Sequence, residues 1–384
     1  GAFYTPLHVV DKAYDQLTAT LGIDWQKKYI VWDMCAGVGN LEAKHSNLRN
    51  VFMSTLDQED VTIMRSNPAF AGAEIFQYDY LNDDVTDFGE IDYELSGKVP
   101  QALRQAIADA REGKKGAKPI LVLINPPYAE AMNADNRKDS GANAAIKSKV
   151  SSTRISHGME HLGYAGRELF VQFMYRIMLE LPNASLAMFS TLKYINAPNF
   201  ALFRERWTAR YLDGFVVHSK AFDALKGSFP IGFLIWDLAI SDPATSVGVI
   251  ALDRSGALIG SHNFYREVPR PPLAEWILRP RSNKTPALPL KNAITPTTST
   301  IDVRGRWWAD GALGSMIAKG NDFQNSGQQT ALLSSGYCSA GAFFVTEENL
   351  SKAAVLFSVR MLIDHHWLIH NDQFLQPLQP LPDE

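Results

Sequence analysis

Apolar and polar residues follow one another along the chain in two rhythms, one typical of helices and one of short buried strands. Near the start, apolar side chains recur at helical spacing from Leu7 to Leu21. Thr5 is a candidate N-cap, Pro6 suits the first turn, and Gly22 is expected to end the helix. The same spacing predicts further helices at Gln101–Arg111, Gly166–Leu181 and Thr346–Asp364, the last with Thr346 as its cap.

Short apolar runs alternate with these helical stretches. They are predicted as strands at Tyr29–Trp32, Val51–Leu56, Glu74–Gln77, Ile120–Ile124, Leu186–Phe189, Gly214–Val217 and Phe233–Trp236. This succession predicts an α/β fold with a doubly wound, Rossmann-like sheet. In such folds the binding site lies at the carboxyl ends of the strands.

Two stretches interrupt the rhythm. Residues 129–164 are rich in Asn, Ser, Lys and Gly, and we expect a long, mobile loop there. Residues 269–296 are rich in proline and basic side chains and are expected to form a linker or irregular segment. The chain should therefore form two domains, or one large domain with an appendage.

The amino-acid composition indicates the class of protein and where in the cell it is expected. Of the 384 residues, 46% are hydrophobic and 20% charged, which is typical of a globular protein. No apolar run reaches the roughly 18 residues that span a bilayer, and the visible start shows no signal segment. Cys35 and Cys338 alone cannot build a disulfide framework or a zinc site. We therefore expect a cytoplasmic protein that does not enter membranes.

Charge is distributed unevenly although the net charge is only −4. Basic residues outnumber acids in Arg137–Arg154 and again in Ser261–Trp307, whereas the first hundred residues lean acidic. Such asymmetry is expected if one part of the chain holds a small molecule and another faces phosphates. Solvated loops of uneven charge would give the same pattern, so charge alone leaves both readings open.

A glycine-rich turn follows the first predicted strand. Asp33 through Asn40 reads D-M-C-A-G-V-G-N, and Gly37 and Gly39 would allow the backbone to approach a ligand closely. Asp57 ends the next strand, where an acid can accept hydrogen bonds from both hydroxyls of a ribose. A purely structural turn and a solvated surface aspartate are the alternatives.

The strongest chemical pattern is Asn125-Pro126-Pro127-Tyr128, directly after the strand Ile120–Ile124. The prolines fix the backbone and lack N–H donors, which leaves carbonyl groups free to accept hydrogen bonds. Asn125 adds a side-chain acceptor and Tyr128 a flat face for stacking. This set suits a planar substrate with an NH2 group, and a rigid structural turn is the alternative.

Taken in order, these motifs resemble those of the gamma-type N6-adenine DNA methyltransferases of restriction–modification systems, over roughly Phe3 to Leu238. Two substitutions, Met34 and Cys35, replace the proline and alanine of the family's D-P-A-x-G-x-G-N motif. The matching segments are Phe3-Tyr4-Thr5-Pro6 for F-x-T-P, Asp33–Asn40 for the glycine motif, Asp57 and Asp79-Tyr80 for the acids after the second and third strands, Asn125–Tyr128 for N-P-P-Y, and Phe229-Pro230 for a later F-P.

The resemblance implies a seven-stranded methyltransferase sheet, S-adenosylmethionine as cofactor and no metal. It implies that Asp57 binds the ribose of the cofactor and Asp79 its adenine amine. The residues implied in cofactor binding are Phe3, Tyr4, Thr5, Pro6, Asp33, Cys35, Ala36, Gly37, Gly39, Asn40, Asp57, Asp79, Tyr80 and Asn125. Those implied at a flipped adenine are Asn125, Pro126 and Pro127, with Tyr128 and Phe229 stacking on the base.

With the resemblance, residues 1–240 are expected to form the catalytic domain, and residues 241–384 a target-recognition or accessory domain for double-stranded DNA. The absence of a Pro-Cys pair argues against cytosine-C5 methylation. Methylation of cytosine N4, of an RNA base or of a protein glutamine stays open, as does a catalytically silent DNA-binding subunit. The sequence also leaves open whether the chain belongs to a larger restriction enzyme, or works with a restriction endonuclease or specificity subunit.

Overall fold

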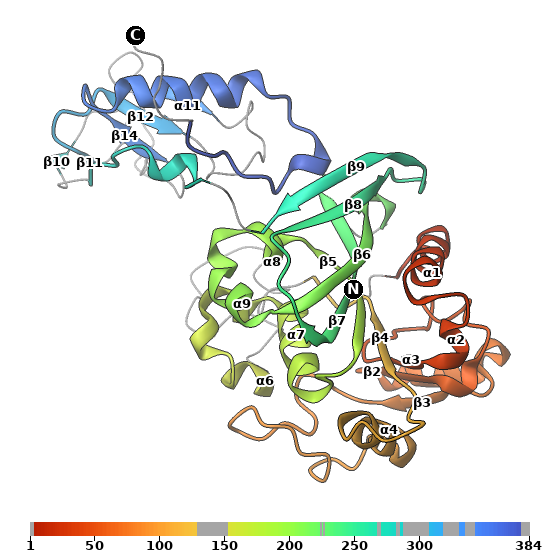
Figure 1. Cartoon of the computed structure of the whole chain (residues 1–384). Helices are drawn as coiled ribbons and strands as arrows, with labels where there is room; N and C mark the ends of the chain where they lie inside the picture. Colours follow the sequence, from red (N-terminus) through yellow and green to blue (C-terminus); the bar gives the residue numbers. More distant parts are fainter. Residues whose placement is uncertain are drawn as a thin grey trace. The chain divides into compact units, whose positions relative to one another are not determined.

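The chain divides into two compact units, Gly1–Arg266 and Glu267–Glu384. The computed structural model, drawn in Figure 1, describes residues 4–128, 153–222, 225, 227–266, 270–281, 285–286, 307–317, 330–334 and 342–377. Phe3, most of the predicted loop 129–164 and half of the segment 269–296 lie outside these residues.

The first unit is built on one nine-stranded sheet in the order β3-β2-β1-β4-β5-β7-β6-β8-β9 (Figure 1). Strands β1 to β5 run parallel to one another, whereas β7 pairs antiparallel with both β5 and β6. The strands are β1 (Ile30–Asp33), β2 (Val51–Thr55), β3 (Glu74–Gln77), β4 (Ile120–Ile124), β5 (Ser185–Thr191), β6 (Ala209–His218), β7 (Pro230–Ser241), β8 (Ser246–Leu252) and β9 (Leu258–Tyr265). The predicted α/β class with a large central sheet is confirmed.

The strand count differs from the expected seven. All seven predicted strands coincide with β1 to β7, but β8 adds in parallel to β6, and β9 pairs antiparallel with β8. Strand β9 could not be predicted from the sequence, because only one of its side chains, Phe264, is buried. The first compact unit therefore continues to Arg266, beyond the boundary placed at residue 240.

The first helix, α1 (Leu7–Leu21), buries Val9, Val10, Ala13, Tyr14 and Leu17 against the sheet. Gly22 ends it at φ 92°, as predicted. The predicted cap was wrong, because Pro6 occupies the N-cap position and no side chain caps the helix. The hydroxyl of Thr5 is engaged elsewhere: it accepts a hydrogen bond from Asn125.

Alternate strand residues face a hydrophobic core shared with α1 and α3 (Gln58–Ser66). In β4, for example, Leu121 and Leu123 belong to this core. Helix α4 (Gln101–Arg111) begins and ends where the sequence predicts. Helix α7 (Leu169–Glu180) begins later than the predicted Gly166, because Glu160–Arg167 forms a 3-10 helix and Glu168 is extended.

The described residues of the second unit include a three-stranded sheet and one long helix. Strands β12 (Gly314–Ile317), β13 (Ala331–Ser334) and β14 (Phe343–Val345) form the sheet, and β10 (Thr285–Pro286) pairs with β11 (Trp307–Trp308). Helix α11 (Leu350–Leu362) starts after Asn349, so the predicted cap Thr346 was wrong. Asn349 accepts a hydrogen bond from the Thr346 N–H at 2.8 Å and donates to the Phe344 carbonyl at 2.9 Å.

Within the described part of the chain, no helix is long and apolar enough to cross a membrane.

Candidate active site

A cavity of about 520 Å³ opens at the carboxyl edge of β1 to β4 in the first unit. Segments that are far apart in the sequence meet there because the carboxyl ends of parallel strands share one edge of the sheet. Its lining includes Tyr4 and Thr5, Asp33 to Gly37, Asn40 and Leu41, Thr55 to Asp57, Asp60, Tyr78 to Asn82, Asn125, Pro127, Thr153, Leu169 and Phe173. Of the predicted site residues, Pro6, Gly39, Pro126, Tyr128 and Phe229 are not part of this lining.

The two glycines of the turn after β1 serve different purposes. Gly37 has φ 55°, and a Cβ atom there would meet only the Tyr4 ring, at 3.9 Å, so the space beside it is open. Gly39 has φ 87°, but its Cβ atom would fall 2.5 Å from Phe70 and 2.8 Å from Met53. Gly39 is therefore required by the hydrophobic core and by its positive φ, whereas Gly37 borders the cavity.

The same turn contains a buried pair of carboxyl groups. Asp33 is 1% exposed and accepts a hydrogen bond from the Cys35 N–H at 2.7 Å. Glu42 is 0% exposed, and within the described residues neither of its carboxyl oxygens has a hydrogen-bond partner, so a charge on Glu42 would be buried close to that of Asp33. Burial raises the pKa of Asp33 to about 6, and burial together with Asp33 raises the pKa of Glu42 well above its usual range. This pair could not be recognised from the sequence, because a glutamate beside a turn normally faces solvent.

We predict that this pair makes stability depend on pH. A raised carboxyl pKa stabilises the fold fully below the ordinary value of 3.8, and this contribution is lost as the pH rises through about 6. The melting temperature should therefore fall between pH 5 and pH 8. Glu42→Gln removes one ionisable group and places a neutral amide beside Asp33, so it should recover about 1–3 kcal/mol of unfolding free energy at pH 8 relative to pH 5.

Thermal unfolding of the parent and of Glu42→Gln across this pH range measures the effect. Glu112→Gln is the matched control, because Glu112 is exposed. Parallel curves of melting temperature against pH for all three proteins would show that Glu42 carries no proton that matters to folding.

Cys35 lies beside the carboxyl pair and lines the cavity. Burial and the charge of Asp33 raise the pKa of its thiol well above the usual range. A protonated thiol is a poor nucleophile. These surroundings do not activate Cys35 as a nucleophile.

Acidic side chains follow β2 and β3 at the same edge. Asp57 comes two residues after β2, is exposed, and occupies the N-cap position of α3 without capping it through its side chain. Asp79 follows β3, and its carboxylate accepts hydrogen bonds from Leu81 N–H at 3.2 Å and Asn82 Nδ2 at 2.8 Å. A carboxylate offers about four lone pairs, so both acids keep acceptor capacity toward the cavity.

Thr5 connects three of the predicted motifs. Its hydroxyl accepts a hydrogen bond from Asn125 Nδ2 at 2.8 Å, and its carbonyl accepts one from Asn40 Nδ2 at 3.4 Å. Donation by Nδ2 leaves Oδ1 as the acceptor side of the Asn125 amide, and the Tyr128 hydroxyl donates to this oxygen at 2.5 Å. The asparagine is therefore held in one orientation by both neighbours.

Tyr128 and Phe229 lie at one edge of the sheet. Tyr128 follows the end of β4, and Phe229 precedes β7, which runs antiparallel and so begins where the parallel strands end. Strand β5 lies between them in the sheet order. Both side chains are partly buried against the hydrophobic core, outside the cavity lining.

The two basic stretches are only partly described. Of Arg137–Arg154, only Thr153 and Arg154 lie within the described residues. In the second stretch, the Arg266 guanidinium donates to the Trp207 carbonyl at 2.6 Å, Arg270 donates to the Gln376 carbonyl at 3.3 Å, and Arg279 lies over the Phe343 ring at 5.3 Å. These three arginines thus have partners within the protein, and phosphate contacts by the two stretches stay a prediction.

Several cavity residues were not among the predicted set. Asn82, Thr153, Leu169 and Phe173 come from the turn after β3, from the segment before α6 (Arg154–His157) and from α7. The Phe173 ring stacks on Tyr80 with centroids 5.3 Å apart. For Leu169 and Phe173 the sequence signal was helical periodicity, which predicts burial but does not separate a cavity wall from a core, and Asn82 and Thr153 had no such signal.

No protein-family model and no curated protein matches the sequence. Among solved structures, the chain is similar to a nuclease-deletion mutant of the Type ISP restriction-modification enzyme LlaGI in complex with a DNA substrate mimic (14% identity, TM-score 0.46, 85% of this chain and 34% of that one). It is also similar to a modification subunit of a putative type I restriction enzyme from Vibrio vulnificus YJ016 (13%, TM-score 0.42, 73% and 57%) and to the type I restriction enzyme EcoKI M protein (14%, TM-score 0.36, 65% and 48%). The chain thus spans less than two thirds of each of these three chains.

Proposed function

We propose that this chain transfers a methyl group from S-adenosylmethionine to the exocyclic N6 amine of adenine in DNA. The observation that supports the proposal best is the convergence of Asp57, Asp79 and Asn125 on one cavity, beside an open glycine turn. Asp57 and Asp79 could accept hydrogen bonds from a ribose and an adenine amine, and Asn125 could accept one from a substrate amine. If these motifs were only structural turns, there would be no reason for all three side chains to line one cavity.

The cavity fits the proposed cofactor in size and in donor and acceptor chemistry. Its volume of about 520 Å³ lies within the range of about 300–1,000 Å³ that is usual for small-molecule sites. Asp57 would accept from the ribose hydroxyls, Asp79 from the adenine amine, and the open space at Gly37 would admit the methionine part. When bound, S-adenosylmethionine supplies a methyl group activated by its sulfonium charge.

The residues beyond the cavity suit a flipped base. Extrusion of an adenine from a duplex costs a few kcal/mol. Tyr128 and Phe229 would stack on it from two sides, and stacking contributes about 1–3 kcal/mol per base, which offsets much of that cost. Both rings lie at the strand edge that bears Asn125.

Asn125 and Pro126 would prepare the amine for reaction. The nitrogen lone pair of adenine N6 is delocalised into the ring, which makes it a weak nucleophile. Acceptance of its two hydrogens by Asn125 Oδ1 and the Pro126 carbonyl would favour a tetrahedral nitrogen with a localised lone pair. The remaining requirement is in-line positioning.

The test of this function is methyl incorporation with identification of the product. The purified chain is incubated with tritium-labelled S-adenosylmethionine and, in separate reactions, duplex DNA, RNA and protein extract. We expect label in DNA only, recovered as N6-methyladenine after digestion to nucleosides and mass spectrometry. Long-read methylation mapping of DNA from cells that express the chain would give the sequence context.

The same experiment separates the alternatives. N4-methylcytosine would overturn the choice of base, and label in RNA or in protein glutamine would overturn the choice of substrate. Cofactor binding without incorporation into any of the three would favour a catalytically silent DNA-binding subunit. A restriction endonuclease or specificity subunit as partner is compatible with each result.

A further inference from the structure

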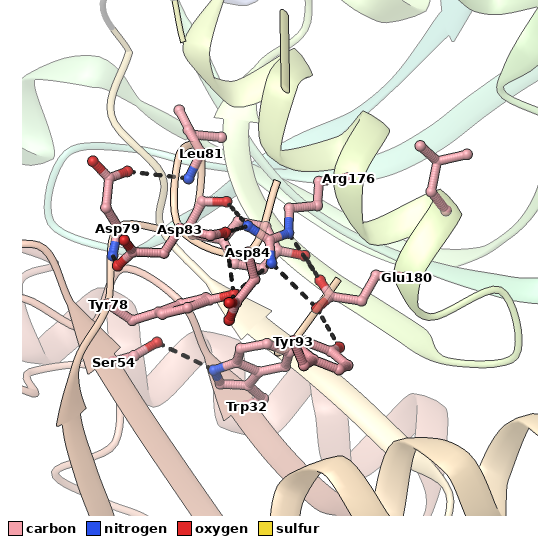
Figure 2. A network of polar contacts seen from close by, with 12 residues as sticks. Trp32, Ser54, Tyr78, Asp79, Leu81, Asp83, Asp84, Tyr93, Arg176 and Glu180 are labelled. Carbon is pink, nitrogen blue, oxygen red and sulfur yellow. Dashed lines mark hydrogen bonds and ion pairs between the residues drawn. The ribbon is translucent and has the colours of Figure 1, made fainter. Parts of the chain in front are cut away.

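A charged network is buried beneath the turn that carries Asp79. Arg176, on α7, has a side chain that is 0% exposed, and its Nε lies 3.3 Å from Glu180 Oε2 (Figure 2). The guanidinium packs against two rings that follow β3, at 4.3 Å from the Tyr80 ring centroid and 5.3 Å from that of Tyr78. A charge in this position needs close partners, because burial without them is very costly.

Arg176 binds both ends of the turn through its guanidinium. One terminal nitrogen donates to the Tyr80 carbonyl and, at 2.8 Å, to the Asp83 carbonyl. The other terminal nitrogen donates to the Tyr78 hydroxyl at 2.6 Å. A planar fork of donors can reach three fixed acceptors at once, whereas a lysine ammonium cannot reproduce that geometry.

The turn that Arg176 holds also fixes Asp79. The Asp79 N–H donates to Asp83 Oδ2 at 2.9 Å, and the Asp79 carbonyl accepts from the Asp83 N–H at 2.7 Å. The Asp79 carboxylate accepts from Leu81 N–H and Asn82 within the same turn. The direction of this carboxylate therefore depends on the path of residues 80–83, and that path depends on the two carbonyls that Arg176 binds.

The carboxylate of Glu180, the partner of Arg176, is also fixed by hydrogen bonds. Glu180 accepts hydrogen bonds from the hydroxyls of Tyr80, at 2.6 Å, and Tyr93. The side chain of Tyr80 is thus fastened to Glu180 while its carbonyl is fastened to Arg176. Tyr80 and Asp79 both line the cavity.

We propose that Arg176 is a positioning residue that gives this protein its selectivity for the adenine amine of its cofactor. The proposal rests on the proposed function, in which Asp79 accepts a hydrogen bond from that amine. Arg176 touches no ligand itself. It acts by holding the carbonyls of Tyr80 and Asp83, so that Asp79 meets the amine in one orientation.

The test compares two ligands that differ at the amine, S-adenosylhomocysteine and S-inosylhomocysteine, by calorimetry. The parent should bind the adenosyl ligand at least ten times more tightly, because the inosyl ligand presents an oxygen to Asp79. The variant Arg176→Met with Glu180→Gln removes both charges together and keeps an acceptor for the two tyrosine hydroxyls, which limits the loss of stability. In this variant the ratio of the affinity for the adenosyl ligand to that for the inosyl ligand should fall toward one. The affinity for the inosyl ligand itself should change by less than threefold.

Two further variants test whether this result comes from the contacts of Arg176 with the turn. Tyr78→Phe removes one acceptor of Arg176 and keeps the ring, so the ratio should fall part of the way even if the double variant does not fold. Arg111→Met is the matched control, since Arg111 donates to the carbonyls of Leu179 and Glu180 at the end of the same helix but does not contact the turn. Its affinity ratio should equal that of the parent.

Each outcome bears on a different claim. A parent that binds neither ligand would overturn the proposed function and the role of Arg176 with it. A parent that discriminates, together with Arg176 and Tyr78 variants that discriminate equally well, would overturn the role of Arg176 alone. A ratio that also falls in Arg111→Met would do the same, because it would show a general effect of loosening α7.

Discussion

Replacement of Asn125 by alanine should lower the single-turnover rate of methyl transfer to DNA by about two orders of magnitude or more, the scale for loss of one preorganised polar group. The reason is that Asn125 would act on the amine as it becomes tetrahedral, an interaction stronger in the transition state than in the ground state. Affinity for the cofactor should change much less. Tritium transfer and calorimetry on the same preparations measure the two quantities.

The hydrogen bonds of Asn125 add an expectation for Tyr128. Its Oδ1, the atom expected to accept from the amine, already accepts from the Tyr128 hydroxyl at 2.5 Å. A carboxamide oxygen has two lone pairs, so it can also accept from the amine. The ring face of Tyr128, and not its hydroxyl, is the part needed for stacking, so Tyr128→Phe should keep most of the activity, whereas Tyr128→Ala should lose the stacking face. Asn183→Ala, at an exposed position outside the cavity, is the control. Near-parental methylation by Asn125→Ala would identify the N-P-P-Y segment as a structural turn, and the central proposal would fail.

Replacement of Asp57 by alanine should weaken cofactor binding by about 1.5–3 kcal/mol, the usual contribution of hydrogen bonds to a charged group. Asp57 borders the cavity, and its side chain does not cap α3, so its carboxylate is available to a ligand. Glu59→Ala is a close control, because Glu59 lies in the first turn of the same helix, is exposed and does not line the cavity. Calorimetric titration with S-adenosylhomocysteine compares the three proteins, and equal affinities would remove Asp57 from the proposed site.

The sequence predicts the sheet well because strands β1 to β7 are short apolar runs with polar ends. It fails at β9, whose side chains are almost all exposed and leave no apolar pattern. It also fails at Thr5, since a hydroxyl before a helix looks like a cap whether or not it is used as one. In the structure this hydroxyl binds Asn125, and only the folded chain brings these two residues together.

The motifs at the strand ends were predictable for a similar reason. Each of Asp57, Asp79 and Asn125 follows a strand that the sequence reveals, and parallel strands bring such positions to one edge. Glu42 and Arg176 could not be recognised, because their importance comes from burial and from partners distant in the sequence. A charged residue on a helix or beside a turn is usually solvated, so its burial becomes visible only in the fold.

The strands β8 and β9 also decide how the first unit could be produced alone. A protein shortened at residue 240 would lack β8, and the backbone groups of Phe215, Val216 and Val217 that face it would form an open edge. Unpaired strand edges recruit other chains, so such a fragment should aggregate during expression. A fragment that ends after Arg266 keeps this edge covered, and the Arg266 side chain still fastens the end of the sheet to the carbonyls of Arg204 and Trp207.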